Sequence, residues 1–255
     1  MKGAGAALAA GLWLALGAQA EATEGSTVVV DQALKKDLET IRDARVFFGH
    51  QSVGKNLLDG VAALAQEAGI ELHLGEATLG ANRDPRSKFE AFARMAEGGV
   101  EADLMVMKLC FVDIDPNTDT DALLAAYRDA VARVRKAKPG VKLLHVTTPL
   151  TGRGTGLKSW LRRTLGRSVW DDDTNAKRLA YNRGLRAMFP ADPIFDLAAL
   201  ESTRPDGSRE EYAVNGQPVP MLWPGYSDDN GHLNEAAKRV AARAFVAALA
   251  EALRR

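Results

Sequence analysis

The sequence has 255 residues, which is long enough for one sizeable hydrophobic core in one or two domains. Hydrophobic residues make up 46% of it and charged residues 26%, which is typical of a globular protein and excludes a disordered polymer. Lys plus Arg and Asp plus Glu both number 33, so no global field would recruit nucleic acid or an anionic membrane. Residues 158–167 are a local exception, with cations around Trp160. A solvated helix face is the favoured interpretation there, and an anion-binding patch is the alternative.

The first twenty residues predict a signal peptide. Lys2 is followed by an apolar run over residues 4–16, and Ala18-Gln19-Ala20 fits the small-x-small cleavage pattern. The run is shorter than the about 20 apolar residues of a bilayer span, and an uncleaved N-terminal anchor is the alternative. We therefore expect an exported protein, periplasmic or secreted, whose residues 21–255 form a single domain without stable membrane insertion. The oligomeric state stays open.

Along the chain, apolar runs alternate about five times with segments of helical period, which predicts βα units and a parallel sheet. The expected strands are residues 45–49, 71–76, 103–111, 141–147 and 193–197. The expected helices are residues 53–68, 87–96, 121–138, 175–188 and 233–253. Residues 202–229 are rich in Gly, Pro and charge and too long for an ordinary connector, so we expect a functional loop there. The fold class is thus α/β, a doubly wound domain that binds ligands at the carboxyl ends of its strands.

Ser52 lies in the segment Gly-His-Gln-Ser-Val-Gly of residues 49–54, where the first expected strand turns into the first expected helix. A serine there sits at the carboxyl edge of the sheet and at a helix N-terminus, which favours developing negative charge. A plain helix N-cap is the alternative, and it is the better interpretation of this feature taken alone.

Asp229 and His232 lie three residues apart, directly before the last expected helix. On a turn that enters a helix, this spacing lets the carboxylate reach one imidazole nitrogen while the other nitrogen faces a nucleophile. An Asp-rich turn with Asp229 or Asn234 as a cap explains the segment equally well on its own. Taken together, the two segments favour catalysis, because both come to the same edge of the sheet.

The combination resembles the SGNH, or GDSL-type, hydrolase superfamily. Phe-Phe-Gly-His-Gln-Ser-Val-Gly at residues 47–54 resembles a variant first block of bacterial SGNH-like proteins, and Asp-Asn-Gly-His-Leu-Asn at residues 229–234 resembles the closing Asp-x-x-His block. The resemblance extends over most of residues 21–255 and implies a flavodoxin-like three-layer sandwich around about five parallel strands. It also implies cleavage or transfer of acyl esters by Ser52, Asp229 and His232, without a cofactor or metal.

Two blocks depart from the family pattern. The usual Gly-Asp-Ser-Leu is His50-Gln51-Ser52-Val53 here, and Cys110-Phe111-Val112-Asp113 replaces the usual Gly-x-Asn-Asp, which removes the expected asparagine donor to the oxyanion. The backbone N–H of Ser52 remains, and Gly80 and Asn82 follow the second strand, where the family supplies a glycine donor. For Asn82, an oxyanion donor and a loop-stabilising residue are equally favoured.

Other polar residues near this edge are less specific. Lys108 is the one charged residue of its apolar strand, and it either pairs with Asp113 or a substrate carboxylate or reaches out from the strand end. His50 is a candidate wall of the pocket. His73 and His145 have no metal-ligand spacing and are expected to be structural. Cys110, the single cysteine, lies in an apolar strand and is a poor nucleophile.

The sequence therefore predicts an exported serine esterase that hydrolyses an O-acyl ester of a small molecule or a glycan through a Ser-His-Asp triad. An α/β-hydrolase of the lipase type is disfavoured, because His50 occupies the first glycine position of Gly-x-Ser-x-Gly. Two alternatives remain: an acyltransferase with the same triad, and a degenerate SGNH module that binds a glycan or a partner protein. In the expected loop, Trp223 and Tyr226 either stack on sugar rings or pack the loop down.

Overall fold

The computed structural model describes residues 31–167 and 169–255, so the predicted signal peptide over residues 1–20 lies outside the described part. Five parallel strands form the central sheet in the order β2-β1-β3-β4-β5. They are β1 (Val46–His50), β2 (Gly75–Thr78), β3 (Leu104–Met107), β4 (Lys142–Val146) and β5 (Ile194–Phe195). This is the flavodoxin-like order. β2 is added on one side of β1, and the later strands are added on the other side. The predicted α/β fold class is confirmed.

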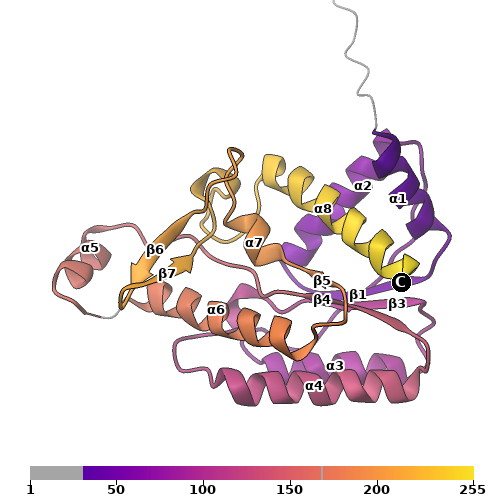
Figure 1. Cartoon of the computed structure of the whole chain (residues 1–255), viewed down its shortest axis with the longest axis horizontal. Helices are drawn as coiled ribbons and strands as arrows, with labels where there is room; N and C mark the ends of the chain where they lie inside the picture. The colour runs from indigo at the N-terminus through magenta and orange to yellow at the C-terminus, as the bar shows by residue number, and fades with distance from the viewer. Residues whose placement is uncertain (1–30, 168) are drawn as a thin grey trace, which may run out of the picture.

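Helices cover both faces of this sheet (Figure 1). One layer consists of α1 (Gln32–Arg42), α2 (Val53–Glu67) and α8 (Glu235–Arg254), and the other of α3 (Pro85–Glu97), α4 (Thr120–Ala137) and α6 (Trp170–Met188). Each layer closes a separate apolar cluster, because side chains alternate between the two faces along a strand. On β1, Phe48 joins the α2 and α8 side, while Phe47 joins the α3 and α4 side.

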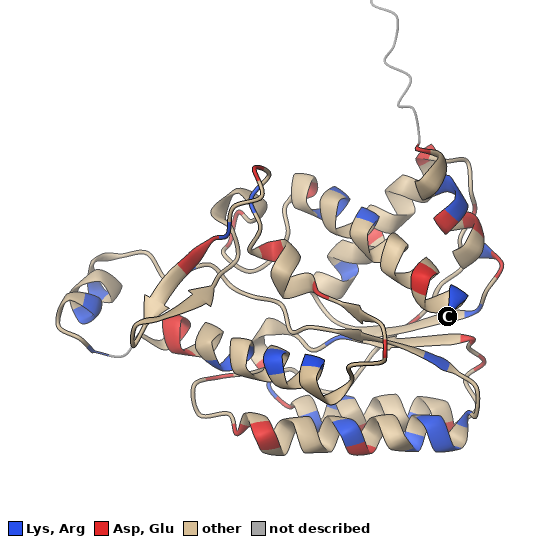
Figure 2. Ribbon diagram, in the orientation of Figure 1, with Lys and Arg blue, Asp and Glu red and all other residues tan. Residues whose placement is uncertain are grey.

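The charged residues are spread over helices and loops on both sides of the sheet (Figure 2), whereas all four residues of β3 are apolar and buried. A strand buried on both faces reads as a continuous apolar run, and this is why β3 was recognisable in the sequence. Within the described residues, no helix is long and apolar enough to cross a membrane.

The expected functional loop over residues 202–229 contains regular structure. It follows α7 (Leu197–Glu201) and holds an antiparallel hairpin of β6 (Glu211–Val214) and β7 (Gln217–Pro220), then a short 3-10 helix, η2 (Pro224–Tyr226). Asn215 and Gly216 form the tip with φ values of 50° and 76°. Both residues tolerate positive φ, and the Asn-Gly pair is the sequence signal of a two-residue hairpin turn.

Three expected strands differ clearly from the structure. The strand expected at 193–197 is shorter, because β5 ends at Phe195 and Leu197 begins α7. The expected strand at 71–76 is wrong over its first four residues, because β2 begins at Gly75. Leu72 and Leu74 pack against the core as irregular chain, and their alternation with polar residues imitates a strand. The third strand is shorter than expected, because the chain leaves β3 after Met107 and turns into the 3-10 helix η1 (Phe111–Asp113).

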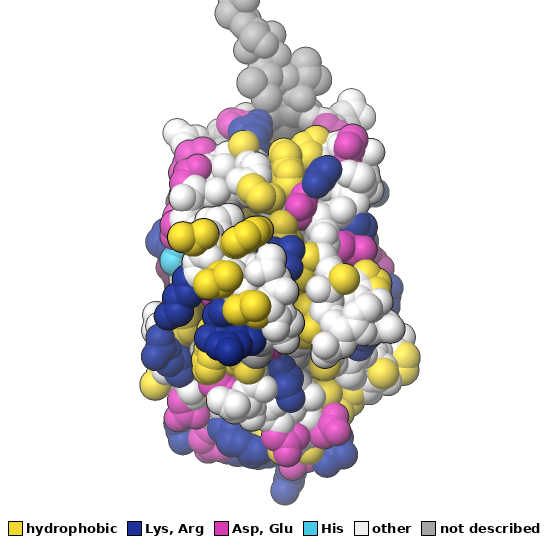
Figure 3. All heavy atoms as spheres, turned by 90° about the vertical axis from the view of Figure 1, so that its left-hand side faces the viewer, with side chains coloured by type: hydrophobic (Ala, Val, Ile, Leu, Met, Phe, Trp, Pro, Cys, Tyr) yellow, Lys and Arg dark blue, Asp and Glu magenta, His cyan; other side chains and the backbone are white. Residues whose placement is uncertain are grey.

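A further short helix, α5 (Leu157–Thr164), stands away from the sheet beside the hairpin and contains no buried residue. It corresponds to the cation-rich segment of the sequence. Its side chains occupy the face of the molecule that Figure 3 turns toward the viewer, where hydrophobic and basic groups lie next to each other.

Candidate active site

Ser52 occupies the turn between β1 and α2, at the carboxyl edge of the sheet. Its backbone has φ 49° and ψ −105°, a conformation that side-chain-bearing residues rarely adopt and that costs on the order of 1–3 kcal/mol. Its side chain makes no capping bond to α2, and Oγ lies 2.7 Å from Nε2 of His232. The helix-cap alternative therefore fails for this serine, since its hydroxyl is directed at the imidazole.

The closing turn orients that imidazole. Nδ1 of His232 lies 2.6 Å from Oδ2 of Asp229, while Oδ1 of Asp229 accepts the backbone N–H groups of Gly231 at 2.9 Å and His232 at 2.7 Å. Hydrogen bonds from the backbone and then the side chain of His232 hold the pKa of the Asp229 carboxyl well below its usual range. Asp229 thus builds the turn and orients the ring, and Asn234 is the residue that caps α8.

Contacts from three other segments fix this turn in place. Asn56 in α2 accepts the Leu233 N–H at 3.2 Å, and the Gly152 N–H donates to the Asn230 carbonyl at 2.8 Å. The edge of the Phe111 ring meets the imidazole of His232 at a centroid distance of 5.3 Å. The side chains of His232 and Asp229 nevertheless remain 45% and 56% exposed, so a substrate can reach them.

Gly80 lies in the loop after β2, as Ser52 lies in the turn after β1. The paired register of the two strands ends at His50 and Thr78, two residues before Ser52 and Gly80. The Gln51 side chain joins the two segments, since its Nε2 donates to the carbonyls of Leu79 and Gly80 at 2.8 and 2.9 Å. Gly80 has a φ of 53° and a Cβ at this position would lie 2.6 Å from the backbone nitrogen of Lys88, so a side chain would be excluded here.

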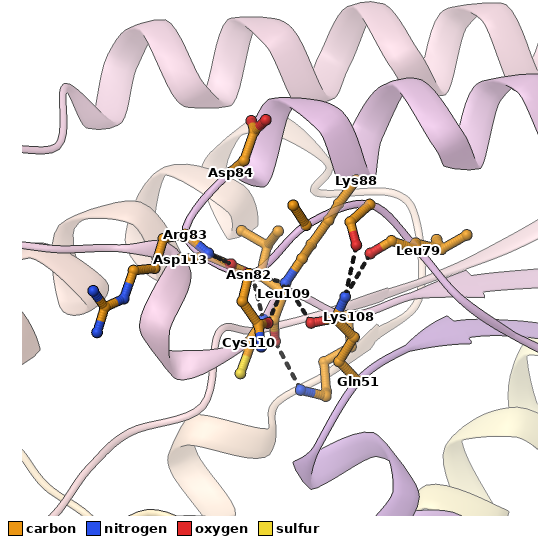
Figure 4. A network of polar contacts seen from close by, with 12 residues as sticks. Gln51, Leu79, Asn82, Arg83, Asp84, Lys88, Lys108, Leu109, Cys110 and Asp113 are labelled. Carbon is orange, nitrogen blue, oxygen red and sulfur yellow. Dashed lines mark hydrogen bonds and ion pairs between the residues drawn. The ribbon is translucent and has the colours of Figure 1, made fainter.

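Lys88 forms the centre of a buried polar network beneath these loops (Figure 4). Its Nζ donates to Oδ2 of Asp113 at 2.6 Å, Oε1 of Gln51 at 3.1 Å and Oδ1 of Asn82 at 3.3 Å. Asp113 also accepts the backbone N–H groups of Cys110 at 2.7 Å and Arg83 at 3.0 Å. The network ties the loops after β1, β2 and β3 to α3, and it fixes the orientation of the Asn82 amide.

The side chain of Lys108 has different contacts from those that the sequence predicts. Lys88, and not Lys108, is the partner of Asp113. Lys108 is 2% exposed and its Nζ donates to the carbonyl of Leu109 at 2.8 Å, so it neither reaches out from the strand end nor lines the cleft. Burial lowers the pKa of Lys108 to about 8.

His50 packs inside the protein below the start of α2. Its Nε2 lies 2.8 Å from Glu76, its ring contacts Phe48, and a Cβ on Gly54 would overlap the ring. Burial lowers its pKa. His50 therefore supports the Ser52 turn from beneath and is not a wall of the cleft, as the sequence had left open.

Asp229 and His232 line a cleft of about 960 Å³. Phe111, Arg178 and Trp170 also line it. Arg178 is 4% exposed and donates to the Phe111 carbonyl at 3.1 and 2.5 Å, so it also holds the residue that packs on the imidazole. Burial lowers its pKa to about 10, which leaves it charged at neutral pH.

Several other residues of the cleft bear charge, which makes it suited to a polar ligand. They are Arg83, Asp84, Arg86, Asp115, Asp119 and Asp171. Trp223 and Tyr226, by contrast, pack on each other at 4.7 Å within the apolar core and do not line the cleft. The loop-packing interpretation of these two aromatic residues is the right one.

Sequence reasoning missed Phe111, Lys88 and Arg178. Phe111 lies in the altered third block, and the presence of an aromatic residue there was the available signal. Lys88 and Arg178 sit on amphipathic helices among other cations, and only the tertiary structure reveals that they are buried.

The comparisons with known proteins are limited to folds. No family model matches the sequence, and no curated protein matches it. Solved structures that match include a carbohydrate acetylesterase family member from Sinorhizobium meliloti, with 15% identity over 83% of this chain and 100% of that chain at a TM-score of 0.48. Another is the periplasmic domain of a lipopolysaccharide acetyltransferase from Salmonella ser. Paratyphi A, with 12% identity over 86% and 95% of the chains at a TM-score of 0.46.

A peptidoglycan O-acetylesterase also matches, with 14% identity over 74% of this chain and a TM-score of 0.46. This chain spans only about half of that one, 48% of its length. Esterases and acetyltransferases are thus among the matching structures. At these identities the likeness concerns the fold alone.

Proposed function

We propose that the protein is a serine esterase of the SGNH type that uses Ser52, His232 and Asp229 to cleave an O-acyl ester. One observation carries the proposal: Ser52 Oγ lies 2.7 Å from His232 Nε2, and His232 Nδ1 lies 2.6 Å from Asp229 Oδ2. In the matching tautomer, Asp229 accepts the Nδ1 proton, and Nε2 is free to accept the proton of the serine hydroxyl.

The reaction proceeds in two steps. His232 takes the Ser52 proton while Oγ attacks the ester carbonyl, and the imidazolium then gives that proton to the departing alkoxide. Water, activated by the same imidazole, hydrolyses the acyl-enzyme. The backbone N–H groups of Ser52 and Gly80 bind the oxyanion in this proposal, since the Gln51 side chain ties the Gly80 loop to the Ser52 turn. The side chain of Asn82 adds a third donor to the oxyanion. Its Oδ1 accepts the hydrogen bond from Lys88, so its Nδ2 group is the part that would donate.

The cleft favours a glycan ester over a simple lipid ester. Charged groups of both signs and the exposed Trp170 ring line it, which suits hydroxyl-rich sugar rings better than an acyl chain alone. A sugar hydroxyl could replace water in the second step, because the triad is open to solvent. Product analysis with a sugar acceptor distinguishes hydrolysis from transfer.

The protein is exported in this proposal, as Lys2, the apolar run of residues 4–16 and Ala18-Gln19-Ala20 indicate. Mass determination of the exported protein should give an N-terminus at Glu21. Recovery of Met1 in an envelope fraction would instead favour an uncleaved anchor.

Fluorophosphonate labelling tests the activated serine directly. The purified protein should be labelled, and Ser52→Ala should abolish the label. Ser208→Ala is the matched control, because Ser208 lies in an exposed turn and its hydroxyl donates to Asp206. A folded parent protein that takes up no label would favour the ligand-binding module without catalysis.

A further inference from the structure

The helix α5 carries an apolar face that points away from the protein. Leu157, Trp160, Leu161 and Leu165 recur at the spacing of one helical face, yet they are 79%, 58%, 49% and 59% exposed. Such a pattern ordinarily marks the buried side of a helix. Here it lies on the outside, and α5 contains no buried residue at all.

A polar contact attaches α5 to the rest of the molecule. Arg163, on the other side of the helix, donates to both carboxylate oxygens of Asp172 at 2.7 Å and to the Gly154 carbonyl at 3.0 Å. Asp172 belongs to α6 and is 6% exposed. The helix is therefore held with Arg163 inward and its hydrophobic side outward, which leaves the hydrophobic side available to a partner.

Cations surround this apolar face. Lys158, Arg162 and Arg167 are exposed, and residues 155–167 contain no acidic residue, although the chain as a whole is electrically balanced. Figure 2 shows α5 with basic and no acidic segments, and Figure 3 shows basic and hydrophobic side chains together on this face. In such a helix, Trp and Leu on one side can enter the acyl-chain layer of a bilayer. The basic residues beside them can contact its anionic headgroups.

We propose that α5 docks the protein onto a bilayer surface that contains anionic lipids. The apolar side chains enter the boundary between headgroups and acyl chains, while the cations bind lipid phosphates. Trp170, 58% exposed, lies just beyond α5 and also lines the cleft, so docking brings the mouth of the cleft to the membrane. This is peripheral binding and involves no membrane-spanning segment.

The surface chemistry favours a bilayer over a second copy of the chain. Among the described residues, the remaining large hydrophobic side chain that is exposed is Val240 on α8, at 46%. It is a single exposed apolar side chain, and its helix neighbours Arg239 and Arg243 already pair with Glu67 and Asp31, so it offers α5 no apolar face to pack against. Two basic apolar patches repel each other, whereas an anionic membrane attracts one.

Vesicle flotation tests the proposal on the exported protein, its N-terminus checked by mass. The protein should float with vesicles of phosphatidylcholine and phosphatidylglycerol, remain unbound with phosphatidylcholine alone, and dissociate as salt rises. The double variant Trp160→Ser and Leu161→Ser should bind at least about tenfold more weakly, and so should Lys158→Glu with Arg167→Glu. All variants should keep the parent's melting temperature, because no α5 side chain is buried.

Val240→Ser is the matched control and should bind as the parent does. Ser52→Ala should also float unchanged, so failure of the esterase proposal and failure of membrane docking give different results. Absence of flotation with anionic vesicles would overturn the proposal, as would full binding by the Trp160 and Leu161 double variant. Self-association that this double variant abolishes, without vesicle binding, would assign the face to a second copy instead.

Discussion

Two polar clusters lie at the same carboxyl edge of the sheet and are built in opposite ways. The closing turn of Asp229 and His232 joins residues three apart in the sequence and leaves both side chains about half exposed. The pair of Lys88 and Asp113 joins residues 25 apart, and its side chains are 2% and 0% exposed. The first arrangement suits groups that must reach a substrate, and the second suits groups that hold loops in place.

The difference separates catalysis from support. An exposed cluster can lose one member without leaving a buried charge, so its substitutions should affect the rate more than the stability. A buried ion pair that loses one member leaves an unpaired charge in a poorly polarisable interior. Five predictions test this separation, in order of decreasing effect.

Ser52 and His232 should act as one catalytic unit. Ser52→Ala, His232→Ala and the double variant should each lower kcat for p-nitrophenyl acetate by a similar factor, on the order of 10⁴ to 10⁶, because either deletion already abolishes the covalent route. Thermal melting of each variant separates lost chemistry from lost folding. A folded Ser52→Ala protein with the parent's full rate would rule out the serine-esterase proposal.

Asp229→Asn should lower kcat by somewhat less, roughly 10⁴-fold. The amide can still accept the backbone N–H groups of Gly231 and His232, so the turn persists. It no longer stabilises the imidazolium or selects its tautomer. The kcat of Asp228→Asn, the same change at a neighbouring position, should stay close to that of the parent. Equal rates for both variants would mean that Asp229 only shapes the turn.

Lys88→Met should destabilise the folded protein by about 3–5 kcal/mol, because Asp113 would remain charged and buried. Urea unfolding measures this loss. Adding Asp113→Asn should recover part of it, since a neutral amide still accepts the Cys110 N–H. The control is Lys55→Met, because Lys55 pairs with Asp59 on the surface, with 61% and 41% exposure, where such a pair contributes about 0–1 kcal/mol. Similar losses for the two Lys→Met variants would contradict the distinction between the two kinds of cluster.

The sequence could predict what depends on local spacing. The turn of Asp229 and His232 was recognisable because its contacts span three residues, and the sheet was recognisable from buried runs such as β3. The hairpin of β6 and β7 was missed even though Asn215-Gly216 is a strong local signal, because the surrounding charge resembled that of an irregular loop.

The sequence could not predict which charges are buried. Lys88 and Lys108 are both lysines next to apolar residues, and only the packing of α3 against the sheet assigns Asp113 to Lys88. The sequence also could not predict that the apolar face of α5 points outward, because its pattern of Leu and Trp is the one that helices normally bury. Tertiary contacts decide both cases, and local propensity contains no information about them.

Asn82 bonds to the supporting Lys88 and is also a candidate donor to the oxyanion, so its substitution tests which role matters. If its amide donates to the oxyanion, Asn82→Ala should lower kcat by roughly 10² to 10³ with little change in KM. The residue is exposed and loses only one weak bond from Lys88, so the stability should change little. Ser87→Ala is the control, because Ser87, in the first turn of α3, bonds to the same loop through the Ala81 N–H and the Asp84 carbonyl. An unchanged kcat for Asn82→Ala would leave the backbone donors of Ser52 and Gly80 to bind the oxyanion.

Glu201 should make the stability depend on pH without taking part in catalysis. It is fully buried, accepts the Leu150 N–H at 2.6 Å through one oxygen, and has no hydrogen-bond partner for the other among the described residues. Burial raises its pKa to about 8 from the usual 4.5. Between these values the folded protein holds a proton that the unfolded chain has released, so stability should fall as pH rises, by at most about 1.4 kcal/mol per pH unit.

Glu201→Gln removes this titration and keeps a neutral acceptor for the Leu150 N–H. Lys108, whose pKa is about 8, contributes a slope only above that pH. The buried His50 and His145, whose pKa values burial lowers, contribute equally in both proteins, so the difference between the two proteins from pH 5 to pH 8 reports Glu201. Urea unfolding of the parent and the variant should therefore show a stability advantage of Glu201→Gln that grows from pH 5 to pH 8. Glu211→Gln, an exposed position in β6, should follow the parent at every pH. Parallel curves for the parent and Glu201→Gln would mean that Glu201 is ionised in the folded protein and stabilised by Lys108 and Arg178, whose charges lower its pKa.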